Sequence, residues 1–197
     1  MPTTSPATPS PKRDQLLNTA WTLFYRDGYR AVGIDTLLEK AGVAKMTLYH
    51  HFASKEDLIV AVLEQRSDGL LATVDRAIAE AGRSPTRQLA AVFEGLKRWF
   101  ASEDFKGCAF IRALSEYPEP DHPIHQAAWR HKRAMNSRLR AIAENAEARD
   151  PAALADSISL LIDGAIVAAH ATSSTAPADS AATAAASLLK LGAARGR

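Results

Sequence analysis

Cysteine is almost missing from this chain of 197 residues, which contains Cys108 alone. A single cysteine excludes any disulfide within the chain and favours a reducing, cytoplasmic setting. Net charge is also nearly absent, at +2. A polybasic coat is thereby excluded, so any binding to nucleic acid depends on a local patch of positive charge.

The sequence also lacks long apolar runs and the alternation of apolar and polar residues that is typical of strands. No run approaches the ~20 residues that a membrane helix requires, so no membrane partner is expected. Motifs typical of enzymes are absent too: there is no glycine-rich phosphate loop, no nucleophile motif and no pair of catalytic carboxylates. We therefore expect neither an enzyme nor a cofactor.

Helical periodicity is present along almost the whole chain. Alanine is abundant, which favours helices, and apolar residues recur at three- and four-residue spacing from Leu16 onward. We predict an all-α fold of about nine helices, of which the first is capped by Ser10 and the last runs from about Ser180 to Leu191. Residues 1–10 are rich in Pro, Ser and Thr, and we expect a disordered tail there and not a signal peptide.

Residues 41–52 carry the clearest functional signal, because they are typical of the turn and second helix of a helix-turn-helix. Gly42 is expected to end one short helix, and residues 43–44 form the turn. Val43 and Leu48 have the spacing of a hydrophobic staple, which fixes the angle at which the next helix leaves the turn. The side chains expected to face solvent on this helix are Lys45, Met46, Thr47, Tyr49 and His50.

These exposed side chains suit contact with DNA, since an α-helix fits the major groove and reads base edges there. Lys45 can donate to guanine, and the methyl group of Thr47 can touch that of thymine. Four further residues suit phosphate contacts: Tyr49, His50, His51 and Lys55. Lys55 occupies the first turn of its helix, where a cation opposes the helix dipole, and a facing phosphate explains it. The alternative is a short, solvated helix that binds no DNA.

Residues 12–60 resemble the N-terminal domain of the TetR family of transcriptional regulators. The matching segments are Phe24–Tyr29, Ile34–Leu37, Ala41–Val43, Thr47–Phe52 and Ser54–Leu58. The resemblance implies that Lys45, Met46 and Thr47 face bases. It implies further that Tyr49, Lys55 and either His50 or His51 hold phosphates of the DNA backbone. Two positions depart from the family's usual pattern. Gly33 stands where a Thr or Ser usually caps the second helix. Ala44 stands where a Ser usually caps the recognition helix.

The resemblance implies two domains: a helix-turn-helix DNA-binding domain at 11–60, and an effector-binding and dimerisation domain at 61–194. It further implies a homodimeric repressor that leaves a near-palindromic DNA operator when a small molecule binds the second domain. The last two helices are the expected dimer surface, because their apolar residues and many alanines permit close packing.

Aromatic residues of the second domain are candidates for lining the effector pocket. They are Trp99, Phe100, Phe105, Phe110, Tyr117 and Trp129, with Met135 beside them. The alternative for each is ordinary core packing, which is the commoner role of aromatic residues at helical spacing.

Other interpretations of the sequence stay open. Cys108 is a candidate redox sensor if Lys106 and Arg112 lower its pKa, in which case the regulator needs no ligand pocket. The histidines at 122, 125 and 131 form no convincing metal set, because Pro123 breaks their helical spacing. A structural DNA-binding protein without an effector and a helical enzyme are further alternatives. The former predicts a body with no cavity.

Overall fold

A computed structural model describes residues 11–194, and within this range it contains nine α-helices and no strand. The predicted all-α fold of about nine helices is confirmed. The helices are α1 Pro11–Asp27, α2 Ile34–Ala41, α3 Lys45–His51, α4 Lys55–Glu80, α5 Pro85–Phe100, α6 Ala109–Glu116, α7 Pro123–Asn145, α8 Pro151–Thr172 and α9 Ala176–Ala194. The predicted tail at 1–10 and the predicted cap at Ser10 lie outside the described residues.

Several helices begin at residues whose side chains or rings suit a helix start. Ser54 accepts a hydrogen bond from the amide of Asp57 at 3.0 Å, and Asp150 accepts one from the amide of Ala153 at 3.0 Å. Such caps satisfy amides that have no partner within the helix. Proline occupies the first turn of α5, α7 and α8, where its missing N–H costs nothing.

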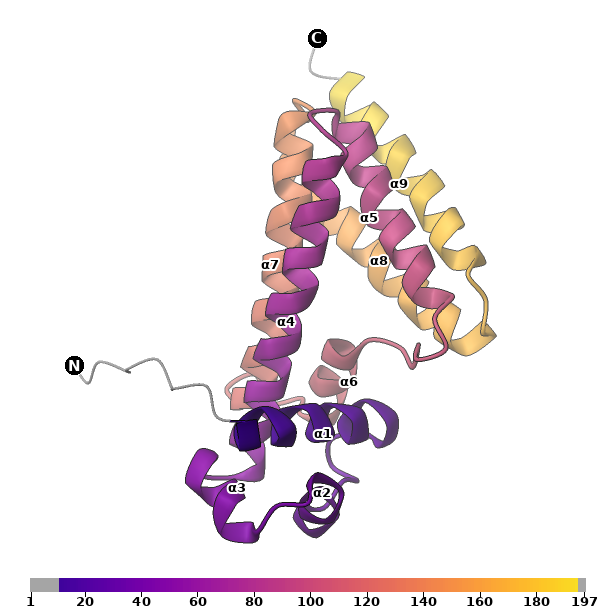
Figure 1. The fold of residues 1–197 in the computed structure, drawn as a ribbon. Coiled ribbons are helices and arrows are strands. Elements are labelled where there is room, and N and C mark those ends of the chain that lie inside the picture. Colours follow the sequence, from indigo (N-terminus) through magenta and orange to yellow (C-terminus); the bar gives the residue numbers. More distant parts are fainter. Residues whose placement is uncertain (1–10, 195–197) are drawn as a thin grey trace, which may run out of the picture.

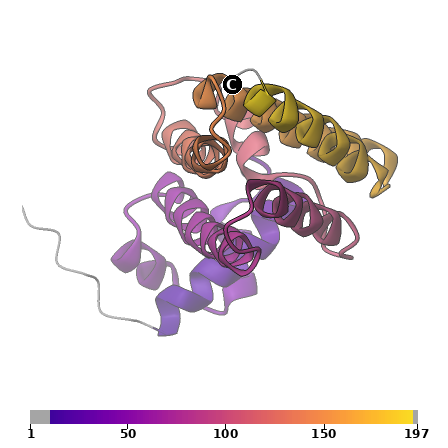
Figure 2. The same cartoon turned by 90° about the horizontal axis from the view of Figure 1, so that it is seen from above.

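The helices form a small head and a larger body (Figure 1). Helices α1–α3 gather at one end, and α4 leads away from them with α7 packed along it. Helices α5, α8 and α9 pack together on the other side of the body, and α9 runs alongside α8 in both views (Figures 1 and 2). The short α6 lies between the head and the body.

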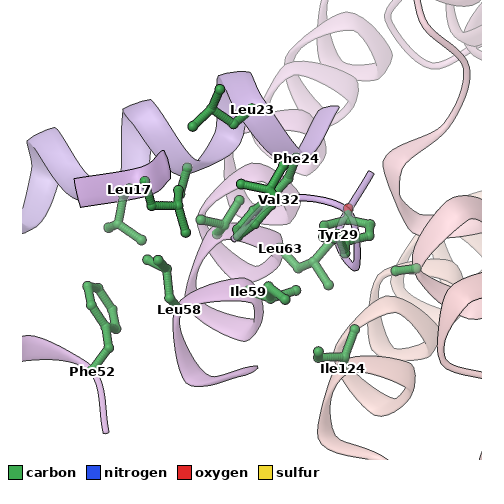
Figure 3. Close-up of a cluster of buried hydrophobic side chains, with 14 of the residues drawn as sticks. Leu17, Leu23, Phe24, Tyr29, Val32, Phe52, Leu58, Ile59, Leu63 and Ile124 are labelled. Carbon is green, nitrogen blue, oxygen red and sulfur yellow. The ribbon is translucent and has the colours of Figure 1, made fainter. Parts of the chain in front are cut away.

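Two hydrophobic clusters hold these parts together. One cluster joins α1–α4 to α6 and the start of α7, so Phe110 and Ile124 belong to the core of the head. Figure 3 shows Ile124 of α7 facing this cluster. The other fills the body between α5, α7, α8 and α9. Cys108 packs against both. The head is therefore buried against the body over a continuous apolar surface, and the boundary at residue 60 stays a prediction.

The predicted start of the last helix is wrong. Helix α9 begins at Ala176 and not at Ser180, and it continues to Ala194, past the predicted end at Leu191. The sequence pattern places a break at Ala176–Pro177, but Pro177 lies within the first turn, where proline is tolerated. The break is instead the short turn that follows Ser173, which has a positive φ of 52°.

Helix α8 is the one described helix that is long and apolar enough, by length and composition only, to cross a membrane, with a mean hydropathy of 1.7. The sequence pattern predicts no such segment. The polar residues of α8 are used within the protein: Asp163 pairs with Lys132, and Asp156 accepts a hydrogen bond from Asn136 at 2.9 Å. Both partners lie on α7. Helix α8 therefore packs against α7 on one side.

Candidate nucleic-acid interface

Helix α3 presents its polar side to solvent at the tip of the head. Leu48 is fully buried, and Val43 packs against the cluster that buries it, as the staple requires. On the opposite side Met46 is 80% exposed, and Lys45, Tyr49 and His50 are also exposed. Thr47 and His51 lie at the edges of this surface. Met46 therefore stands open to solvent among the polar side chains of α3.

The N-caps of α2 and α3 lack side-chain hydrogen bonds. Gly33 precedes α2 and Ala44 precedes α3, and both have the extended backbone of a cap without a capping oxygen. In contrast, Gly42 takes the left-handed conformation, with φ of 60°, that ends α2 and opens the turn. The turn is therefore fixed by backbone geometry and by the buried staple, not by capping side chains.

The amino end of α1 brings two cations to α3 that the sequence pattern alone did not indicate. The guanidinium of Arg13 lies 5.3 Å from the ring centre of Phe52, which follows α3 directly. Lys12 and Arg13 also act electrostatically on His51. Both stand in the first turn of α1, where a cation opposes the dipole, so the same signal that singles out Lys55 could have singled them out.

His51 titrates in a positively charged environment. Partial burial lowers the pKa of its imidazole below the ordinary value, and His50, Arg13 and Lys12 lower it further. A DNA phosphate placed here would act in the opposite direction and favour the charged imidazole. The amino end of α1 and the carboxyl end of α3 thus form one basic cluster suited to the DNA backbone.

Lys55 has a partner within the protein. Its ammonium donates to the carbonyl of Arg30 at 3.4 Å, which lies in the turn between α1 and α2. Burial lowers the pKa of Lys55, while the carboxylates of Glu56 and Glu116 raise it. The first-turn position of Lys55 is thus explained in part without a phosphate, and its DNA contact stays a prediction.

Helix α6 and the segment that precedes it are hydrogen-bonded to the carboxyl end of α1. The Tyr25 hydroxyl donates to the carbonyl of Gly107 at 2.9 Å and accepts from the amide of Lys106 at 3.0 Å. Arg112 donates to the carbonyl of Tyr25 at 2.8 Å, and so satisfies a carbonyl that the end of α1 leaves without a partner. These bonds join residues more than eighty positions apart in the chain.

Glu116, the last residue of α6, is hydrogen-bonded to the turn that follows α1. Its two carboxylate oxygens accept from the amide of Tyr29 at 3.1 Å and from the amide of Arg30 at 2.7 Å. The Arg30 guanidinium lies 4.8 Å from the ring centre of Tyr117, the residue after Glu116. Glu116 and Tyr117 thus connect the end of α6 to the turn that leads into the helix-turn-helix.

Gly28 is required where α6 meets this turn. It has a positive φ of 94°, and a Cβ added there would lie 2.9 Å from a Glu116 oxygen. We expect Gly28→Ala to lower the free energy of unfolding by about 2 kcal/mol, because backbone strain adds to the weakening of a carboxylate hydrogen bond. Gly42 is the matched control. It also has positive φ but open space around its Cβ position, so Gly42→Ala should cost about 1 kcal/mol. Urea unfolding of both variants measures the difference, and equal costs would contradict the role of Glu116.

The six aromatic pocket candidates do not share one cavity. Trp99, Phe100 and Phe105 form a cluster, with ring centres 4.9 to 5.8 Å apart. Phe110 instead stacks on His131 at 3.6 Å in the space between head and body. Tyr117 lies beneath Arg30, and Trp129 is 53% exposed on α7. The structure thus brings three candidates together and separates the other three.

Cys108 lies in surroundings that disfavour its thiolate. Burial raises the pKa of the thiol, and the cation that opposes this effect is Lys132. Neither Lys106 nor Arg112, the neighbours expected to lower the pKa, is among the causes of the shift. A buried thiol with a raised pKa reacts slowly with oxidants, so the geometry gives no support to the redox alternative.

Polar partners within the protein engage the histidines and most cations of α7. His122 accepts from the amide of Ile124 at 3.2 Å, and a ring nitrogen of His125 lies 2.8 Å from the carbonyl of Tyr117. No group of three metal-ligating side chains occurs among residues 11–194. The ion pairs of α7 are Arg130–Glu64, Lys132–Asp163, Arg138–Asp75 and Arg140–Glu144. The basic residues of α7 are thereby largely neutralised by carboxylates within the protein.

The outer face of α8 and α9 is apolar and unpaired in the single chain. Leu160 is 74% exposed and Val167 is 56% exposed on α8, and Leu191 is exposed on α9. A shallow hollow of about 640 Å³ lies along this face, between Leu160 and Ala181. Leu160 lines this hollow. Exposed large apolar groups on one face are typical of a protein interface.

The sequence matches two family profiles. Residues 16–62 match the profile described as bacterial regulatory proteins, tetR family, and residues 85–185 match that of the tetracyclin repressor-like C-terminal domain. The chain is similar to the crystal structure of SCO4454, a TetR-family transcriptional regulator from Streptomyces coelicolor. The two share 32% identity and a TM-score of 0.88, over 94% of this chain and 92% of that one.

Two curated relatives match over less than half of this chain. The transcriptional activator FasR of Mycolicibacterium smegmatis is 41% identical over 81 residues, which are 41% of this chain and 37% of FasR. The transcriptional repressor KstR2 of the same organism is 34% identical over 89 residues, 45% of this chain and 43% of KstR2. The matches thus span less than half the length of these relatives, and one activates while the other represses.

Proposed function

The chain belongs to the TetR family of DNA-binding transcriptional regulators, and from this premise we propose that it is a homodimeric repressor of the cytoplasm. In this proposal two α3 helices occupy successive major grooves of a near-palindromic operator, and a small molecule that binds the body releases them. The observation that carries the proposal is the exposed side of α3, where Met46 stands out from a head whose other large apolar residues are mostly buried.

The DNA contacts follow from the positions of the exposed groups. Lys45, Met46 and Thr47 face the bases in this proposal, because they precede Tyr49 on the open side of α3. Tyr49, His50, His51 and Lys55 hold phosphates, and Lys12 and Arg13 join them from α1. With a net charge of only +2, this cluster supplies the local positive field that attracts DNA.

The dimer joins the α8–α9 faces of two chains. Two such faces build a four-helix bundle in which Leu160, Val167 and Leu191 leave water. A dimer places its recognition helices about 34–36 Å apart, one turn of DNA, and so requires a near-palindrome. The hollow between α8 and α9 gives the partner's side chains a place to enter.

Release from DNA uses two connections between body and head. Helix α4 runs without a break from Lys55, beside the recognition helix, to Glu80 in the body. Helix α6 holds the end of α1 through Arg112 and the following turn through Glu116. A ligand that shifts either helix changes the separation of the two heads. The protein then has two states, one that binds DNA tightly and one that binds the ligand tightly. Ligand binding therefore lowers the affinity for DNA.

The alternatives have less support. A redox mechanism needs a reactive Cys108, whose thiol is buried with a raised pKa. A structural DNA-binding protein without effector predicts a solid body, whereas the described body contains a hollow of about 260 Å³ beside Phe105. A helical enzyme has no support from the relatives, which are transcriptional regulators.

Two substitutions test the assigned DNA contacts. Lys55→Ala should weaken binding on all sequences and flatten the slope of log affinity against log salt by about 0.9 for each phosphate that is no longer neutralised. Thr47→Ala should instead keep the slope and reduce base preference at one position by about 1 kcal/mol. The measurement is anisotropy titration on a near-palindrome recovered from random duplexes and on scrambled DNA.

Arg83→Ala is the control for charge alone, because Arg83 is exposed in the turn between α4 and α5, outside α1–α3 and the α8–α9 face. If Lys55→Ala lowered stability but left the salt slope intact, Lys55 would serve the contact with Arg30 and not DNA. Recovery of no bound duplex from the random pool would overturn the proposed function itself.

A further inference from the structure

A hollow of about 260 Å³ lies where the carboxyl ends of α5 and α8 approach the segment between α5 and α6. Figure 1 shows these helix ends close together, above the head. Aromatic rings, hydroxyl groups and two basic side chains line it: Phe100, Ser102, Phe105, Lys106, Ala169, His170 and Ser173. Its lining is more polar than apolar. The polar groups suit a small polar ligand, and the rings of Phe100 and Phe105 offer it apolar contact.

The polar groups of this hollow are mostly donors without acceptors. In the described chain the ammonium of Lys106 and the hydroxyl of Ser173 make no ion pair or hydrogen bond, and the ring of His170 makes only an edge contact with Phe105, at 6.2 Å. No carboxylate lines the hollow, and the neighbouring Glu103 and Asp104 are exposed outside it. A ligand that accepts hydrogen bonds and carries negative charge would satisfy all three groups.

The apolar side of the hollow favours a flat ring. Phe100 is buried, and its ring centre lies 4.9 Å from that of Phe105, which in turn meets Trp99 edge-on at 4.9 Å. Aromatic pairs prefer such tilted and edge-on arrangements, and a further ring would extend the cluster. We infer that the hollow is a binding site for a small aromatic carboxylate, with its ring against Phe105 and its carboxylate on Lys106, His170 and Ser173.

The backbone around the hollow is held in uncommon conformations. Ser173 is one of two described non-glycine residues with positive φ, at 52°. Gly107 has φ of 83°, and a Cβ there would meet the His170 ring at 3.4 Å. Residues in such conformations collect at ligand sites, where the surrounding structure holds them in place. The glycine allows the α5–α6 segment to lie directly against His170.

Lys106 belongs both to the hollow and to the contact between body and head. Lys106, whose side chain would bind the carboxylate, donates its own amide to the Tyr25 hydroxyl on α1, and its carbonyl accepts from Arg112. A ligand that draws Lys106 toward His170 therefore displaces the hydrogen bonds that the Lys106 backbone makes with Tyr25 and Arg112. This regulatory consequence rests on the proposed function, whereas the binding itself does not.

Calorimetric titration of the full chain with 2-naphthoate tests the site. The uncharged 2-naphthamide has the same rings, so it should bind at least tenfold more weakly if the carboxylate meets Lys106. Lys106→Gln should lower the affinity for 2-naphthoate at least tenfold and leave that for 2-naphthamide unchanged. Lys190→Gln, on exposed α9, is the matched control and should change neither.

Three results would overturn the inference: no heat with either compound at millimolar concentration, equal affinity for acid and amide, or a Lys106→Gln variant that binds 2-naphthoate normally. DNA is absent from this titration, so its outcome is independent of the proposed function. A chain that binds 2-naphthoate but no duplex would refute the regulator and keep the site. A chain that binds DNA but not 2-naphthoate would support the regulator and refute the site.

Discussion

Replacing both Leu160 and Val167 with aspartate should convert the proposed dimer to a monomer and lower operator affinity at least a hundredfold. The two side chains lie on one side of α8, 74% and 56% exposed in the single chain. In the proposed four-helix bundle their replacement buries four unpaired carboxylates, two from each chain, and such groups are costly to remove from water. Affinity falls because one head then binds half an operator without the other head held close by.

Sedimentation velocity measures the oligomeric state of this double variant, and anisotropy titration measures its DNA binding. Leu70→Asp is the matched control, because Leu70 is an exposed leucine on α4, outside the α8–α9 face. It should leave the dimer and the affinity intact. If the double variant stayed dimeric with normal folding, the interface would lie elsewhere and the role proposed for α8 and α9 would fail.

Local features of the head could be predicted because their causes lie within a few residues. The left-handed Gly42, the cap at Ser54 and the buried Leu48 follow from spacing along one short stretch of chain. Helix α2 ends at Ala41, directly before Gly42, where the sequence predicts the end of a short helix. Short-range rules of capping and periodicity determine such elements before any tertiary contact forms.

The contacts between head and body could not be predicted, because they join distant parts of the chain. Nothing near Glu116 in sequence indicates that its carboxylate caps the amides of Tyr29 and Arg30. The same region gives Lys55 a partner at Arg30, whereas the helix dipole alone would assign Lys55 to DNA. The position of Lys55 thus has two explanations, a DNA phosphate in front of its helix and the carbonyl of Arg30. Only the first can be inferred from the local sequence.

The aromatic residues of the body illustrate the same limit. Helical spacing marks Phe110 and Trp129 as equal candidates for a pocket, yet Phe110 stacks on His131 while Trp129 faces solvent. Lys106 and His170, which line a hollow beside Phe105, carry no signal in the periodicity because one lies in a connecting segment and the other near a helix end. A site assembled from the ends of elements is visible only after those elements are packed.

Lowering the pH from about 7.5 to about 4.5 should destabilise the protein by about 2–3 kcal/mol through His131 alone. Its ring is 4% exposed and stacks on Phe110, and a ring nitrogen lies 3.0 Å from the Ser67 hydroxyl. Burial, with Lys132 and Arg138 nearby, lowers its pKa from 6.5 to about 4. The unfolded chain binds a proton below pH 6.5 that the folded chain accepts only near pH 4, so stability falls with pH across that window.

The position of His131 makes this destabilisation relevant to the proposed switch. It lies on α7 between Ser67 of α4 and Phe110 of α6, the two helices that connect the body to the head. A charge placed there opposes the packing of both. Urea unfolding at several pH values should therefore show a smaller pH slope for His131→Gln than for the native chain. His170→Gln, at an exposed histidine of α8, should keep the native slope. Equal slopes for His131→Gln and the native chain would show that acid acts through other groups and that the contact between α4, α6 and α7 is insensitive to this proton.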